Sequence, residues 1–199
     1  MNIGIIGYGN LGKALVSGLL LAGIEQKNII VNAKTEKTRT GVKRAFADIY
    51  VTDDKEELVK KSEVLMVVVE PNNAQTVLAE LGRNDLSNKV IVSFMAGVTR
   101  EMIRAMIGLL ETHISIVRVM PNLAIANGNG VLGITYDDSD EEYVLKTIKI
   151  FEKLGYTMRL DEEQLDYITV TAASGLAFAA TLMDSYQKAC NHFFCNEMQ

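Results

Sequence analysis

Short apolar runs alternate with amphipathic stretches along most of this chain. Each run is a compact block rich in Val, Ile and Leu, and such blocks indicate β-strands that are buried on both faces. The stretches between them carry apolar residues at helical spacing. Strands and helices that take turns in this way predict an α/β protein with a doubly wound parallel sheet. The predicted strands are Asn2–Ile6, Ile29–Asn32, Ile49–Val51, Val64–Val69, Val90–Ser93 and Ile114–Met120, and the predicted helices are Leu11–Ala22, Lys55–Lys61, Ala74–Leu81 and Glu101–Leu110.

The pattern changes after Gly133. A helix is predicted over Tyr143–Leu154, and the acidic residues Asp161–Glu163 then open a last segment that runs nearly to the end of the chain. In this segment apolar residues recur at steps of three and four, which predicts a long helix with one apolar stripe. We expect the stripe to form a homodimer or larger homo-oligomer; the alternative is a helix that folds back on its own domain at a break near Gly175. The stripe consists of Leu165, Ile168, Ala172, Leu176, Ala179, Met183, Tyr186, Cys190 and Phe193.

Composition and charge narrow the class of protein. Of the 199 residues, 48% are hydrophobic and 23% are charged, which is typical of a globular protein with a real core. The formal net charge is −5, from 20 basic and 25 acidic residues, so we expect no nucleic-acid partner. The chain starts without a basic segment or a cleavage site, and its apolar runs are shorter than a bilayer requires. We therefore expect a reduced, cytoplasmic protein without a membrane partner.

A glycine-rich motif follows the first predicted strand and opens the first predicted helix. It reads Gly7-Tyr8-Gly9-Asn10-Leu11-Gly12 and has the GxGxxG spacing in a strand–turn–helix context. In this motif the first glycine allows a tight turn, the second lets the backbone approach a pyrophosphate, and the third permits close helix packing. The helix N-terminus then offers N–H groups to the phosphates. The motif predicts a dinucleotide-binding site in a Rossmann-type sheet, with Ile6 at its border.

The end of the second predicted strand indicates which dinucleotide is bound. A carboxylate there would hold a ribose 2′-hydroxyl, whereas a cation suits a 2′-phosphate. Here the strand ends at Asn32-Ala33 and is followed by Lys34-Thr35, with no carboxylate at the tip. We therefore expect NADP, with NADPH preferred over NADH.

Other strand ends supply further candidates at the ligand edge of the sheet. Pro71 and Pro121 stand just beyond two predicted strands, where a missing N–H interrupts no strand pairing. Asn122 follows Pro121 and is either a ligand to cofactor or substrate or an ordinary turn residue. No metal site is expected, because Cys190, His192 and Cys195 point in different directions on a helix. The candidates for the cofactor's nicotinamide half are Val68, Val69, Glu70 and Pro71 after one strand and Met95, Ala96 and Gly97 after the next.

Taken in order, these motifs resemble those of pyrroline-5-carboxylate reductase, an NAD(P)H-dependent enzyme of proline synthesis. The resemblance rests on GYGNLG, VVVEP, SFMAGV, RVMPNLA and DYITVTAASGLAF and covers essentially the whole chain. Three positions depart from the family pattern: Glu70 replaces a common Lys, Lys55 replaces a frequent Asn near the adenosine ribose, and Leu176 replaces a usual Pro. The family also continues well beyond residue 199, so we expect a truncated gene product or a relative that lost the substrate half.

The resemblance implies a fold, a reaction and a set of roles. The fold is an NAD(P)-binding Rossmann domain over residues 1–160, followed over 161–199 by the start of a helical substrate and dimerisation domain. The reaction is NADPH-dependent reduction of the C=N bond of 1-pyrroline-5-carboxylate to proline. Lys55 joins the cofactor-binding residues, and Asn122 and a Ser174-Gly175 turn face the imine. Two alternatives stay open: a reductase for another imine or a deazaflavin, and a nucleotide-binding protein with a regulatory role and no catalysis.

Overall fold

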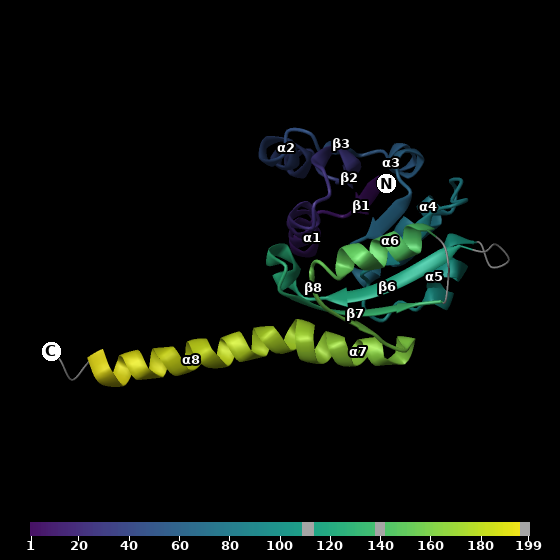
Figure 1. The fold of residues 1–199 in the computed structure, drawn as a ribbon. Helices are drawn as coiled ribbons and strands as arrows, with labels where there is room; N and C mark the ends of the chain where they lie inside the picture. Colours follow the sequence, from purple (N-terminus) through teal and green to yellow (C-terminus); the bar gives the residue numbers. More distant parts are fainter. Residues whose placement is uncertain (109–113, 138–141, 196–199) are drawn as a thin grey trace.

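The computed structural model describes residues 1–108, 114–137 and 142–195. Its centre is an eight-stranded sheet in the order β3-β2-β1-β4-β5-β6-β7-β8 (Figure 1). The order reverses between β1 and β4, as in doubly wound folds. The strands are β1 (Ile3–Ile6), β2 (Ile29–Asn32), β3 (Tyr50–Thr52), β4 (Val64–Val67), β5 (Val90–Ser93), β6 (Ser115–Pro121), β7 (Gly130–Tyr136) and β8 (Gly155–Arg159).

The predicted parallel sheet is confirmed from β3 through β6 and needs correction beyond it. All neighbours from β3 to β6 pair in parallel, whereas β6 and β7 pair antiparallel and β8 then pairs parallel to β7. The sequence did not predict β7 or β8. Pro121 lies inside β6 as its last residue, opposite Leu132, and not beyond the strand.

Helices cover both faces of the sheet and enclose two apolar cores. One core includes Leu15 of α1, Val42 of α2 and Phe151 of α6, and the other includes Leu58 of α3, Leu78 of α4 and Ile103 of α5. The predicted helices are confirmed within a few residues; α2 was not predicted, and Leu110 lies outside the described residues. The helices are α1 (Asn10–Leu21), α2 (Glu36–Ala45), α3 (Lys55–Lys61), α4 (Ala74–Leu81), α5 (Arg100–Ile107) and α6 (Glu142–Phe151), with 3₁₀ turns η1 (Gln26–Asn28), η2 (Pro71–Asn73), η3 (Leu123–Asn127) and η4 (Glu162–Gln164).

The C-terminal segment is one continuous helical rod that leaves the domain (Figure 1). It consists of α7 (Leu165–Ile168), a π-helical turn η5 (Thr169–Ser174) and α8 (Gly175–Cys195). The helix runs through Ser174 and Gly175, so the predicted turn there is wrong, as is the alternative of a helix folded back near Gly175. Phe178 and Tyr186 are 71% and 73% exposed. By length and composition alone, the stretch Glu162–Phe193 would also suffice to cross a membrane, a test that core helices of soluble proteins also pass.

Glu162 anchors the beginning of this rod to the sheet. One carboxylate oxygen accepts from the Arg100 backbone N–H at 2.7 Å and from Arg118 at 2.9 Å, and the other accepts from the Arg100 side chain at 3.3 Å. Arg118 on β6 is buried, so its charge depends on this partner. Burial alone would raise the pKa of Glu162, but these hydrogen bonds hold its pKa below the ordinary value.

Acid should loosen this junction. Because the pKa of Glu162 is lowered in the folded state, its stabilisation is present above the unfolded pKa of about 4.3 and is lost as the pH falls through the folded value. We expect the wild type to lose more thermal stability between pH 5 and pH 3 than Glu162→Gln, measured by circular dichroism. Glu163→Gln, at the exposed neighbouring position, should behave like the wild type. Equal acid sensitivity in all three proteins would contradict this assignment.

Candidate functional site

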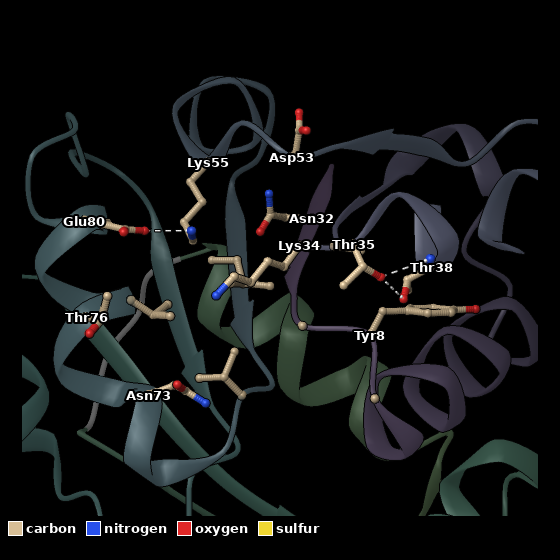
Figure 2. A pocket seen from close by; sticks show the side chains of 16 residues that line it. Tyr8, Asn32, Lys34, Thr35, Thr38, Asp53, Lys55, Asn73, Thr76 and Glu80 are labelled. Atoms are coloured by element: carbon tan, nitrogen blue, oxygen red, sulfur yellow. Dashed lines mark hydrogen bonds and ion pairs between the residues drawn. The ribbon is translucent and has the colours of Figure 1, made fainter. Parts of the chain in front are cut away.

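A cavity of 520 Å³ lies at the carboxyl ends of β1, β2, β3 and β4. It is placed where the strand order reverses, which is the usual ligand crevice of open α/β sheets. The turn after β1 forms one wall, and the first two turns of α4 form the opposite wall (Figure 2). We call this space the strand-end cavity.

The glycine-rich turn has the backbone geometry that its three glycines require. Gly7 has a φ of +103°, and a Cβ at this position would overlap the carbonyl oxygen of Val68. A Cβ at Gly12 would overlap the carbonyl oxygen of Gly7, so α1 can approach the turn only because Gly12 has no side chain. At Gly9, by contrast, a Cβ would meet no atom within 4 Å. Gly9 therefore faces open space, where a pyrophosphate would fit against the backbone.

The N-terminus of α1 is free to receive an anion. Its N-cap residue, Gly9, provides no side-chain hydrogen bond to the first turn, and that turn has no acidic residue. The N-termini of α2, α3 and α5 are capped by the side chains of Thr35, Asp54 and Thr99. Uncapped N–H groups and the positive end of the helix dipole make the α1 terminus a suitable phosphate site.

Charged side chains around the cavity leave one cation unpaired among the described residues. Lys55 and Glu80 form an ion pair of 2.7 Å across the rim, and Asp53 pairs with Arg39 at 3.1 Å (Figure 2 shows the first pair). The Asp53 carboxylate points away from the cavity in Figure 2. Lys34 extends into the cavity and makes no ion pair with any described residue. The uncompensated charge of the site is therefore positive and lies beside the end of β2.

The polar groups beside Lys34 are held in fixed positions. The Arg39 guanidinium donates to the backbone carbonyls of Ala33 and Lys34, both at 3.0 Å. The Thr35 hydroxyl accepts from the Thr38 backbone N–H at 3.2 Å, and the two threonine hydroxyls are 2.8 Å apart. Tyr8 also lines the cavity, and burial raises the pKa of its hydroxyl, so it is neutral near pH 7. The site offers one free ammonium and several hydroxyl groups to a phosphate.

Half of the predicted cofactor residues line the strand-end cavity. Those that do not line it lie next to it or farther along the same sheet edge: Asn10 and Leu11 begin α1, Glu70 precedes η2 and Pro71 begins it, and Met95 is buried just after β5. Val68 is buried beside Gly7, and Ala96 and Gly97 follow Met95. The predicted residues that line the cavity are Ile6, Gly7, Tyr8, Gly9, Lys34, Thr35, Lys55 and Val69.

The structure adds wall residues that sequence reasoning missed. Four of them are spaced at three, four and seven residues and form one face of the start of α4. This helical spacing is a local signal for a shared face, whereas the position of that face opposite Gly9 follows from the strand order. The others end or follow β2, follow β3, or lie on α2. The added residues are Asn32, Ala33, Thr38, Asp53, Asn73, Thr76, Val77 and Glu80.

The three predicted catalytic residues lie apart from this cavity lining. Asn122 is buried between β6 and η3 and contacts the carbonyl of Ala172 in η5. Ser174 ends η5 with an exposed side chain, and Gly175 begins α8. The structure thus brings Asn122 and the π-helical turn together at the carboxyl end of β6.

Comparison with known proteins decides the family. Residues 2–97 match the family model described as "NADP oxidoreductase coenzyme F420-dependent". A pyrroline-5-carboxylate reductase from Aquifex aeolicus is 34% identical over 196 residues, which cover 96% of this chain and 69% of the relative. The chain belongs to the pyrroline-5-carboxylate reductase family. The resemblance predicted from the motifs is confirmed, and membership makes the chain an NAD(P)H-dependent oxidoreductase.

Solved structures carry the same fold. A pyrroline-5-carboxylate reductase from Coxiella burnetii is 25% identical and superposes with a TM-score of 0.82, covering 96% of this chain and 70% of that one. The pyrroline carboxylate reductase of Plasmodium falciparum, solved with NADP bound, is 24% identical and has a TM-score of 0.82. The match covers 95% of this chain and 68% of that one. The predicted Rossmann-type sheet, followed by C-terminal helices, is the architecture that this chain shares with these structures.

Proposed function

We propose that this protein reduces the C=N bond of 1-pyrroline-5-carboxylate to give proline in the cytoplasm. The observation that supports this most strongly is the empty space in front of Gly9 and the uncapped α1 N-terminus, in a chain that belongs to the reductase family. The nicotinamide cofactor would supply hydride to the ring carbon, and the imine nitrogen would gain a proton. We assign residues 1–160 to nucleotide binding and 161–199 to the start of a substrate and dimerisation domain.

The chain's own residues would bind and orient the reactants. Gly7, Gly9, Asn10 and Leu11 offer backbone groups to the pyrophosphate, and the predicted nicotinamide residues follow β4 and β5 at the same edge. Orientation of a reactive pair contributes much of the rate in such reactions, which is why this site needs no dedicated acid–base pair.

Activity on the intact chain tests this function directly. NADPH oxidation is followed by absorbance with 1-pyrroline-5-carboxylate as substrate, and proline is quantified as product. We expect proline to form in proportion to the NADPH that is consumed. Nucleotide binding without turnover, measured on the same sample by calorimetry, would instead support a binding protein.

Lys34 should set the preference for NADPH over NADH. Its ammonium is the cation beside β2 that pairs with no described residue, so Lys34→Ala should weaken NADPH binding by about 1–2 kcal/mol, as loss of an exposed charge-assisted contact does. NADH binding should stay nearly unchanged. Calorimetric titration of both nucleotides measures the effect, and Lys37→Ala, an exposed lysine outside this cavity, is the matched control. Equal affinity of the wild type for the two nucleotides would contradict the role of Lys34.

A second candidate rests on the description of the matched family model, which names coenzyme F420. In this case a deazaflavin would replace the imine as hydride partner of NADP. Parallel assays with the deazaflavin and with 1-pyrroline-5-carboxylate separate the two functions, because only the true substrate should support NADPH oxidation.

A further inference from the structure

Asn122 uses both the oxygen and the nitrogen of its side-chain amide to join three backbone segments. Its Oδ1 accepts from the backbone N–H groups of Ala124, at 3.2 Å, and Val131, at 3.3 Å. Its Nδ2 donates to the carbonyl of Ala172 at 3.3 Å. The partners fix the orientation of the amide, because a flipped group would place NH₂ against two N–H donors and oxygen against a carbonyl. Asn122 is only 7% exposed, so these contacts are shielded from water.

The carbonyl that accepts from Asn122 belongs to the π-helical turn. Before this turn the rod is fastened to the sheet by Glu162 and by Leu165, which is fully buried against Gly133. After it, Leu176 is already 52% exposed and the rod leaves the domain. The bond from Asn122 therefore holds the helix at the point of departure, in a turn whose wider hydrogen-bond pattern is often found at functional sites.

We propose that Asn122 is a positioning residue that fixes the π-helical turn, and with it Ser174, at the carboxyl end of β6. This inference rests on the proposed reductase function. β4, β5 and β6 run parallel, so their ends bring Val69, Gly97 and Asn122 to the edge where the nicotinamide half is proposed to bind. The exposed hydroxyl of Ser174 faces solvent beyond this joint and is available to a substrate. The side-chain hydrogen bonds of Asn122 described above all go to backbone groups, so we assign its role to the turn that it holds.

The variant Asn122→Asp isolates the bond to the turn. Aspartate keeps an oxygen for the N–H groups of Ala124 and Val131, whereas its second oxygen faces the Ala172 carbonyl without a proton to donate. At pH 8, amide exchange over residues 169–178 should be about tenfold faster than in the wild type, as expected for the loss of one buried hydrogen bond. The NADPH dissociation constant should change less than about twofold, since the strand-end cavity is untouched.

A pH dependence distinguishes positioning from general loss of structure. Protonation of the introduced carboxylate in Asn122→Asp restores an O–H donor toward Ala172, so the variant-to-wild-type exchange ratio should fall toward one as the pH is lowered from about 8 to below the pKa of that carboxylate. Asn129→Asp is the matched control: Asn129 donates to the Asn127 carbonyl at 3.3 Å in an exposed loop near the same strands, and its exchange ratio should stay at one. If Asn122→Asp fails to fold, Asn122→Ser keeps an acceptor without the reach to Ala172 and should show the same faster exchange.

Turnover completes the test. For Asn122→Asp we expect both faster amide exchange over residues 169–178 and a lower kcat for imine reduction, while the affinity for NADPH stays unchanged. Reduced turnover with wild-type exchange would overturn the proposal, because Asn122 would then act directly on the substrate. Wild-type exchange and turnover would overturn it as well. If the wild type shows no imine reduction, the proposed function fails, while the exchange ratios still show whether Asn122 holds the turn.

Discussion

Replacing Gly9 with valine should reduce the affinity for NADPH and NADH by at least about 100-fold while the fold stays intact. Gly9 has a φ of −77°, which a valine can adopt, and no atom lies within 4 Å of a Cβ built there. The new side chain would therefore enter the space reserved for the pyrophosphate without disturbing the protein. Calorimetry of both nucleotides, together with a thermal unfolding curve, measures the two effects.

A second glycine provides the control for this experiment. Gly41 on α2 also faces open space, so Gly41→Val should bind both nucleotides as the wild type does. Gly12→Val should also lose nucleotide binding, but through reduced stability of the fold. A Cβ there would overlap the carbonyl oxygen of Gly7 and destabilise the packing of α1. Normal nucleotide binding by a folded Gly9→Val protein would remove the glycine-rich turn from the site.

In solution the protein should have twice the 21.9 kDa mass of one chain. α8 has 21 residues, about 32 Å at 1.5 Å per residue, and its apolar side chains are exposed. Leu182 and Met183 are each 72% exposed, and the alanines that precede them on α8 allow close helix approach. A twofold pairing would cover this surface. Asp184 and Lys188 form an ion pair on the same helix, which favours aqueous surroundings over a bilayer.

Light scattering during size-exclusion chromatography in detergent-free buffer measures this mass. Met183→Glu should shift the protein toward one chain, because dimerisation would bury the added charge. Ser185→Glu adds the same charge two residues away, on another face of α8, and should leave the mass doubled. A wild-type mass near 21.9 kDa up to about 100 μM would contradict the prediction.

The parts of the fold that escaped prediction lack a local signal. α2 is mostly charged and polar, and Val42 is its one buried residue, so it lacks the repeated apolar residues from which the other helices were predicted. β7 contains Gly130 and Gly133, which weaken a strand pattern; both are explained only by tertiary packing, since a Cβ at Gly133 would crowd Leu165 and Ile168. β8 is a half-exposed edge strand and has no apolar run.

The residues of the candidate site also differ in whether a local sequence signal predicts them. The glycine turn and Lys34 were predictable because a short motif follows directly after a strand, and the sequence contains both parts of that signal. The α4 wall was missed because its position opposite Gly9 depends on the strand order. The contact between Asn122 and Ala172 joins residues fifty positions apart, and no spacing rule indicates it.

The pairing of β1 with β4 makes the stability of the fold depend on the concentration of the nucleotide cofactor. Ile3 lies opposite Val64, so the strand that leads into the glycine turn gains its second neighbour only from a distant part of the chain. The strand-end cavity straddles this seam, with Gly7 on one side and Val69 on the other. A nucleotide that binds only the folded state adds about 2.7 kcal/mol of stability at a concentration about 100 times its dissociation constant. Cells depleted of the nucleotide would thus hold a larger unfolded fraction of this protein and lose it faster to proteolysis.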